Sequence, residues 1–105
     1  MIRTESHVVK PPRDGDVAQA DMTLPRGTEF LGVMAVPHAS VPDYYLPMMS
    51  IRVNTEWPDF VYPVWTVVDR TEMVVDGLDE ATYLGSYVLN GVILHVFHGD
   101  GQPRT

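Results

Sequence analysis

The chain has 105 residues, seven Lys and Arg against fourteen Asp and Glu, a net charge of −7 and no cysteine. This length suits one domain with one modest core. An acidic chain lacks the basic face that nucleic acid requires, and without cysteine there are no disulfides, thiolate metal sites or cysteine nucleophiles. No apolar run is long enough to span a membrane and the first residues lack a signal-peptide core, so we expect neither nucleic acid nor membrane as a partner.

Nine prolines and eight glycines separate short apolar segments, which is typical of strands joined by turns. We expect an all-β fold, a small antiparallel sandwich or barrel-like sheet of about six to seven strands. Residues 1–105 would form a single domain with an N-terminal arm (1–16), a β core (17–98) and a C-terminal tail (99–105). In chain order, the expected strands are 5–10, 17–24, 28–36, 48–53, 61–69, 71–75, 83–89 and 92–98, with one helical turn at 78–82. Pro63 predicts an edge position or a bulge, since proline cannot donate to a ladder.

Asn90 and Gly91 form the strongest hairpin signal in the sequence, because a type I′ turn requires positive φ at both positions. Side chains alternate along each strand, so this turn fixes which residues face each other. On one side we expect the pairs Leu89 with Val92, Tyr87 with Leu94, Gly85 with Val96 and Tyr83 with His98. On the other side we expect Val88 with Ile93, Ser86 with His95 and Leu84 with Phe97. Both sides are largely apolar, so we expect both to be covered, either by a core and a covering strand or arm, or by a core and another subunit.

Three stretches, LPRGTEFLGV, VYPVWTVVDR and YLGSYVLNGVILHVFHGD, resemble the pattern of a small uncharacterised bacteriophage-encoded family. In that pattern a Leu-Pro-x-Gly turn leads a strand, a Trp-containing strand ends in Val-Asp, and the chain closes with Tyr-Leu-Gly-Thr and His-Val-Phe. The resemblance covers roughly residues 20–98 and departs from the pattern in the insert PHASVPDYYLP and in Ser86, where Thr is usual. It implies a small β-sheet protein from a bacteriophage or prophage, and it brings no known activity.

The spacing of the histidines predicts neither a catalytic triad nor a metal site. His38 stands near Ser40 and Asp43, but a catalytic triad needs a nucleophile on a strained turn, and no Gly-x-Ser-x-Gly sequence occurs. His7 has no partner at a useful spacing and is interpreted as a surface residue. We therefore expect no enzyme activity, no catalytic residue, no metal ligand and no cofactor; an enzyme would instead show a cleft in which His38 or His95 meets a carboxylate.

His95 and His98 are three residues apart on a strand, so they should point to opposite faces and share no metal ion. We expect His95 to form a cross-strand polar pair with Ser86 and to accept or donate a hydrogen bond with its hydroxyl, since a buried imidazole needs a partner.

Large apolar and aromatic side chains give the candidate interface. Trp57 would either fold its loop over the sheet or contact a partner, and the stretch PDYYLPMM concentrates adaptable apolar surface. The candidate interface residues are Tyr44, Tyr45, Met48, Met49, Trp57, Tyr83, Tyr87, Leu94, Val96 and His98.

These features predict a non-enzymatic phage protein that acts through protein–protein contacts with other subunits, as a homo-oligomer or on a phage structural protein. Its place would be the virion, as a decoration or minor structural protein made in the host cytoplasm. The alternative is a soluble host-takeover or anti-defence binder that sequesters a host protein or a small signalling nucleotide. A nucleotide site would need several basic groups, and with seven Lys and Arg it would be shared between subunits.

Overall fold

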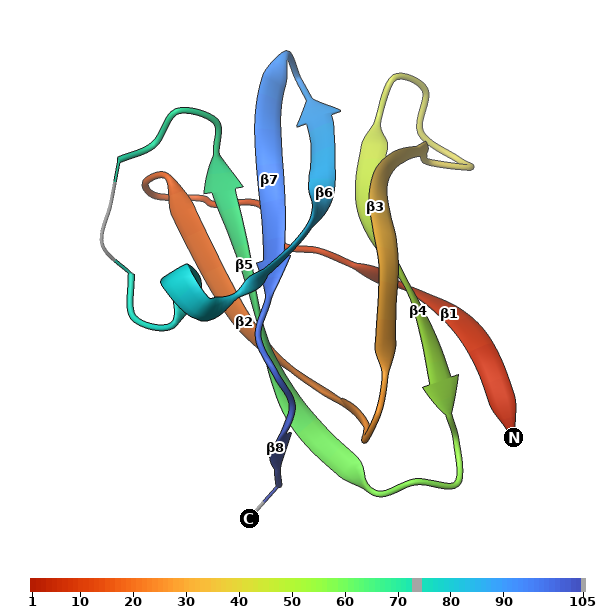
Figure 1. Cartoon of the computed structure of the whole chain (residues 1–105). Coiled ribbons are helices and arrows are strands. Elements are labelled where there is room, and N and C mark those ends of the chain that lie inside the picture. The colour runs from red at the N-terminus through yellow and green to blue at the C-terminus, as the bar shows by residue number, and fades with distance from the viewer. Residues whose placement is uncertain (73–74, 105) are drawn as a thin grey trace.

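The computed structural model describes residues 1–72 and 75–104, and within them the protein is all-β, as expected. Two antiparallel sheets face each other without closing into a barrel (Figure 1). The first sheet has the strand order β1-β4-β3, with β1 at Ile2–Val8, β3 at Glu29–Pro37 and β4 at Tyr45–Asn54.

The second sheet has the strand order β2-β5-β7-β6, and a short strand, β8, also pairs with β5. Among the described residues, one 3₁₀ turn, η1, precedes β6. The bounds are Val17–Pro25 for β2, Asp59–Val68 for β5, Leu78–Glu80 for η1, Thr82–Leu89 for β6, Val92–His98 for β7 and Gln102–Pro103 for β8.

The two ends of the chain are part of the sheets. The segment expected as an N-terminal arm contains β1, which pairs with β4 from Ile2 opposite Asn54 to Val8 opposite Met48. The expected tail contains β8, which pairs with β5. The short strand expected over 71–75 falls partly outside the described residues, because 73 and 74 are not among them, and the residues on either side belong to no strand.

The chain crosses between the sheets twice at one end of the molecule, from β2 to β3 and from β4 to β5 (Figure 1). The two connections hold each other: the Arg26 amide donates to the Pro58 carbonyl at 2.7 Å, and the Arg26 guanidinium lies 4.6 Å from the centre of the Trp57 ring. Gly27 has φ 74°, and a Cβ there would lie 2.9 Å from that ring. Trp57 therefore anchors its own loop to the β2–β3 turn rather than folding it over a sheet, and its expected role in contact stays a prediction. Gly27 is required both for its φ and for this close approach.

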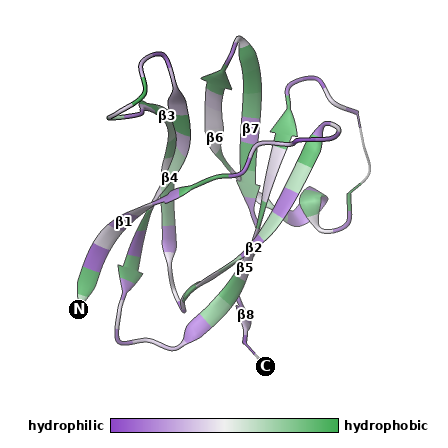
Figure 2. Cartoon of the chain, turned by 180° about the vertical axis from the view of Figure 1, so that it is seen from behind, coloured by the Kyte–Doolittle hydropathy of each residue, from purple (hydrophilic) through white to green (hydrophobic). Residues whose placement is uncertain are grey.

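The core lies between the inner faces of the sheets. Alternate residues of β4 point inward and are fully buried, and they meet the inner residues of the β6–β7 hairpin and of β5. The buried cluster comprises Val9, Leu24, Met49, Ile51, Val53, Tyr62, Val64, Tyr87, Leu94 and Val96. In Figure 2 the strands β5 and β7 are apolar over most of their length, whereas polar residues interrupt β1 and β2.

The hairpin register agrees with the expectation from Leu89 opposite Val92 as far as Gly85 opposite Val96. Beyond this point it is wrong by one residue: a bulge at Leu84 places Tyr83 opposite Phe97 instead of His98. Gly85, at φ 153°, supplies a backbone conformation that other residues rarely adopt. A Cβ at Gly85 would lie 3.4 Å from Val33, so the bulge occurs where β6 passes the neighbouring edge strand β3.

Pro63 lies in an inner strand rather than at the expected edge or bulge. It pairs with Asp21 of β2, and on its other side β7 pairs with β5 only from Val64 onward while β8 pairs only with Phe60 and Val61. The Pro63 carbonyl accepts from the Gly99 amide at 2.9 Å across this break. The missing proline N–H thus falls in a gap between two partner strands, where no ladder bond is lost.

Tyr87 and Tyr62 provide a matched pair of stability tests. Tyr87 is 4% exposed, and its hydroxyl has no hydrogen-bond partner among the described residues, whereas the Tyr62 hydroxyl donates to the Pro25 carbonyl at 3.1 Å. Removing an unsatisfied buried hydroxyl relieves its desolvation cost, so we expect Tyr87→Phe to leave the free energy of unfolding unchanged or raise it by about 1 kcal/mol. Tyr62→Phe should lower it by about 1 kcal/mol in the same urea titration. A loss in Tyr87→Phe as large as that in Tyr62→Phe would contradict this account.

The same burial predicts a pH effect at the alkaline end. Burial raises the pKa of Tyr87 from 10.0 to about 12. The neutral phenol is favoured in the folded state, so its contribution is complete below pH 10 and is lost as the pH rises toward 12. Urea titrations between pH 10 and 12 should therefore show a smaller decline in the free energy of unfolding in Tyr87→Phe than in the wild type. Equal declines in the two proteins would contradict the raised pKa of Tyr87.

Candidate interaction surface

Four of the residues expected at an interface belong to this chain's own core. Met49, Tyr87, Leu94 and Val96 are buried between the sheets, so they cannot contact a partner and their assignment to an interface is wrong. Their position follows from the alternation of β4 and of the hairpin, whose inner faces meet each other.

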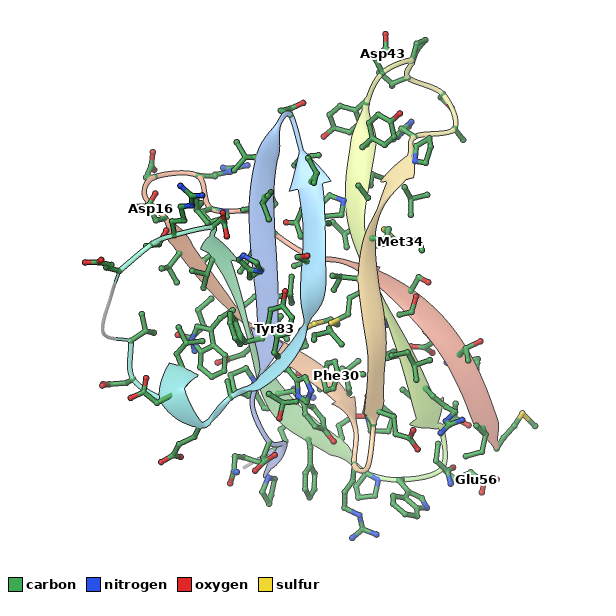
Figure 3. The ribbon with its side chains drawn as sticks, turned by 45° about the horizontal axis from the view of Figure 1, so that its top comes forward. Asp16, Phe30, Met34, Asp43, Glu56 and Tyr83 are labelled. Carbon is green, nitrogen blue, oxygen red and sulfur yellow. The ribbon has the colours of Figure 1, made fainter. Side chains whose placement is uncertain are left out.

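The remaining candidates are divided between the interior and the surface. His98 points inward and stacks on Phe30 of β3, with ring centroids 4.0 Å apart, while Met48 lies partly buried on the outer face of β4. Figure 3 shows Phe30 between β3 and the second sheet. The other four, Tyr44, Tyr45, Trp57 and Tyr83, are exposed.

An apolar patch covers the outer face of the first sheet, toward the end that carries the β3–β4 loop. Register places Val8, Met48 and Met34 in one row across β1, β4 and β3, and Leu46 beside Val36 in the next outer row. We call these five side chains the Met34 face. Val8 is 53% exposed and Met34 59%, and the other three are partly buried. Figure 3 shows Met34 on the side of β3 turned away from the second sheet.

The charges on the same outer face are balanced. At the other end of the sheet Arg52 of β4 and Glu29 of β3 stand opposite each other and form a salt bridge. Between this pair and the Met34 face lies a row of small residues, Ser6, Ser50 and Gly32. Beyond the Met34 face the outer face is mixed, because the exposed apolar residues Ile2 and Leu31 stand among these polar and small side chains.

The β6–β7 hairpin is buried on one face only within this chain. Its inner face joins the core, while Val88 (57% exposed) and Ile93 (42% exposed) face outward near the turn, opposite each other. Of the two ways to cover the outer face, a covering strand or arm is not seen over these two residues in the described part of the chain. Further along the sheet, Trp65 of β5 is covered, because the ring lies against Gly77 and Gly99.

A hydrogen-bonded chain of three side chains lies on the outer face of the hairpin. His95 Nε2 is 2.8 Å from Asp69 Oδ1, and His95 Nδ1 is 2.8 Å from Tyr83 Oη. Ser86 is the cross-strand neighbour of His95, as expected, but the hydrogen bond expected between them is not made, since both ring nitrogens have other partners. Asp69 directly follows β5 and lies outside the β6–β7 hairpin. Side-chain alternation within the hairpin therefore could not show that Asp69 reaches His95.

The chemistry of this chain is limited by its own hydrogen bonds. A carboxylate only accepts, so His95 Nε2 donates to Asp69 and Nδ1 accepts from the Tyr83 hydroxyl. The neutral ring has no free nitrogen with which to take a proton from a substrate until one bond breaks. An enzyme was expected to show a histidine beside a carboxylate in a cleft, and His95 does lie beside the carboxylate of Asp69. The two hydrogen bonds fix the orientation of the imidazole ring.

His7 has a partner, contrary to the expectation. Its Nε2 lies 3.0 Å from Glu5 Oε1, and Arg3 pairs with the other oxygen of the same carboxylate. All three side chains point to the inner side of β1, because they stand opposite the buried residues of β4. The hydrogen bond from His7, and then the one from Arg3, lowers the pKa of Glu5 below its usual value. The sequence did contain a signal for this contact: Glu5 and His7 are two residues apart, and side chains at this spacing lie on the same face of a strand.

The loop between β3 and β4 does not assemble a triad. The His38 Nδ1 accepts from the backbone amide of Ser40 at 3.1 Å, and the imidazole packs edge-on against Tyr44. Among the described residues, no hydrogen bond joins His38 to the Ser40 hydroxyl or to Asp43. These contacts hold the loop in shape.

The described residues contain neither a candidate metal site nor a membrane-spanning helix. Within residues 1–72 and 75–104, no group of three or more His, Cys, Asp or Glu side chains is placed to hold a metal ion. In the same part of the chain, no helix is long and apolar enough to cross a membrane.

Comparison with known proteins finds no matching family model, no similar curated protein and no matching solved structure. The likeness to a phage-encoded family therefore remains a prediction from the sequence motifs.

The His95 tautomer is open to direct measurement. We expect the neutral ring to carry its proton on Nε2, because Asp69 can only accept. Nitrogen chemical shifts of histidine-labelled protein at alkaline pH would show it. Asp69→Asn removes the constraint and should allow the other tautomer, whereas Tyr83→Phe, which removes only a donor to Nδ1, should not. A wild-type ring protonated on Nδ1 would contradict the hydrogen-bond chain.

Proposed function

We propose that this protein acts by contact, as a subunit of a protein assembly, and that its Met34 face is the surface on which a second copy of the chain docks. The observation that carries this proposal is the cluster of neighbouring apolar side chains, in part more than half exposed, on the outer face of the first sheet. Contiguous apolar patches of this kind are unusual on monomeric proteins and are common at contact sites.

Charge favours a second copy as the occupant. The whole chain carries −7, so two copies repel each other on most approaches. On the outer face of the first sheet, however, Arg52 and Glu29 neutralise each other. Two copies related by a twofold axis can place this face against itself with no excess of like charge, which is the requirement of an isologous dimer.

The assembly that the sequence motifs favour is a phage particle, in which the protein would be a decoration or minor structural component. The alternative, a soluble host-takeover or anti-defence binder, would use the same kind of apolar contact on a host protein. Mass spectrometry of purified particles distinguishes the two: stoichiometric copies in the particle support the first, and absence from the particle supports the second.

The contact itself is tested by the oligomeric state. We expect size-exclusion chromatography with light scattering to show a dimer or higher oligomer, and Met34→Lys to raise its dissociation constant at least about tenfold, because a desolvated charge replaces an apolar contact. The matched control is Val88→Lys, which makes the same change of charge on the outer face of the other sheet.

Three outcomes decide this test. Loss of the oligomer in Met34→Lys but not in Val88→Lys supports the Met34 face. Loss in Val88→Lys alone would move the interface to the hairpin and overturn the assignment. A wild-type chain that remains monomeric at the highest soluble concentration would overturn self-association altogether.

A further inference from the structure

A hollow opens on the inner side of β2, where the sandwich is not filled by large side chains. Ala18 and Ala20 are the inner residues there, standing opposite Thr66 and Val64 of β5. The alanine side chains are too short to contact the segment 9–16, which crosses over them and joins β1 to β2. The hollow has a volume of about 160 Å³ and is lined mainly by apolar groups of Val8, Val9, Ala18, Ala20, Met22 and Val64.

The segment that joins β1 to β2 forms the opposite wall. Figure 2 shows this segment running from the end of β1 across the sheets to the start of β2. Val9 is buried beneath it, which fixes the segment against the core, and Pro11 and Pro12 stiffen the stretch that follows. The wall is thus part of the folded structure.

The mouth of the hollow is basic. An adjoining cavity of about 490 Å³ is lined by Lys10, Pro11, Arg13, Ala18, Gln19 and Tyr44. Lys10, Ala18 and Gln19 line both cavities, so the apolar hollow adjoins the cavity that Arg13 lines.

The two cations at this mouth are not neutralised by the protein. Among the described residues, Arg3, Arg52 and Arg70 each form a salt bridge, whereas neither Lys10 nor Arg13 has a carboxylate within 4.0 Å. In a chain of net charge −7, two unpaired cations that line one cavity beside an apolar hollow form a site suited to an anion.

We propose that this groove binds a small organic anion whose carboxylate or phosphate lies between Lys10 and Arg13, and whose aromatic ring or short alkyl group enters the hollow. The size fits, because an apolar cavity of about 150 Å³ accommodates benzene. Tyr44 and Gln19 also line the mouth, and their hydroxyl and amide groups provide further hydrogen-bond donors for the anionic head group. The hollow shares Val8 with the Met34 face, whereas Lys10 and Arg13 lie outside that face. Substitutions of these two cations therefore test the groove without changing the proposed contact surface.

The test is an amide NMR titration of the wild-type chain with benzoate and with phenyl phosphate. We expect saturable shifts centred on the amides of Val9, Ala18, Ala20 and Thr66, with a dissociation constant on the order of 1 mM, as for other small fragments. Benzyl alcohol has the ring without the charge, and inorganic phosphate has the charge without the ring. Both should bind at least about tenfold more weakly than the charged aromatic probes.

Variants locate the site. Lys10→Gln and Arg13→Gln should each weaken benzoate binding about tenfold, since each removes one charged hydrogen-bond donor. Arg104→Gln, the same change at an exposed residue outside the groove, is the matched control and should bind as the wild type does. Ala20→Leu should abolish binding by filling the hollow, and the two Gln variants at exposed residues keep the test valid if the larger side chain affects folding.

The outcomes separate the sources of binding. If benzoate binds and phenyl phosphate does not, the head group is a carboxylate; the reverse result assigns a phosphate. Equal binding of inorganic phosphate and phenyl phosphate would overturn the role of the hollow. Shifts unaffected by Lys10→Gln and Arg13→Gln, or no shifts at the solubility limit of the probes, would overturn the proposal.

Discussion

The fold depends on one packing contact, that between the inner face of β4 and the inner face of the β6–β7 hairpin. Met49 and Ile51 are fully buried on one side and Val96 on the other. Burying such side chains contributes about 1.5 to 3 kcal/mol each before the loss of chain entropy is counted. Strict alternation along β4 and β7 decides which residues make this contact, and it leaves the intervening residues on the outside.

The sheets differ in width, and this difference explains where surfaces and hollows occur. The first sheet has three strands, whereas the second has four in its main path. The segment from Val9 to Asp16, rather than another strand, covers the inner face of β2. A linking segment packs less closely than a strand, and with alanines opposite it a hollow remains. The outer face of the narrower sheet has no cover in the described chain, so its apolar residues stay exposed.

Much of this fold is readable from local sequence. The Asn90–Gly91 turn fixes five pairs of the hairpin, from Leu89 to Gly85, because turn geometry and side-chain alternation are local properties. The sequence does not predict local structure that depends on contacts with residues far away in the chain. The bulge at Leu84 arises where β6 passes β3, and Asp69 reaches His95 only because β5 lies beside β7. The assignment of Tyr87 to an interface fails because the sequence cannot tell which apolar face of the hairpin meets its own core.

The Met34 face contains one residue expected at an interface, Met48, and its role in contact stays a prediction. Its neighbours Val8 and Met34 come from strands far away in the sequence, so no local pattern could have shown this patch. The basic groove likewise joins Lys10 to Tyr44, which no spacing rule connects. Patterns identify the face of a strand, whereas the order of strands in a sheet decides which faces become continuous.

The charged row on β1 protects one edge of the first sheet against the addition of another strand. An edge strand offers unpaired backbone groups to any passing strand, and continued strand addition leads to fibres. Glu5 and His7 lie on the inner side of this edge and the exposed Arg3 pairs with Glu5, so an added strand would have to desolvate charged groups. Addition of a strand to the backbone of β1 is thereby discouraged. The charged side chains of β1 thus act against fibre growth at this edge of the first sheet.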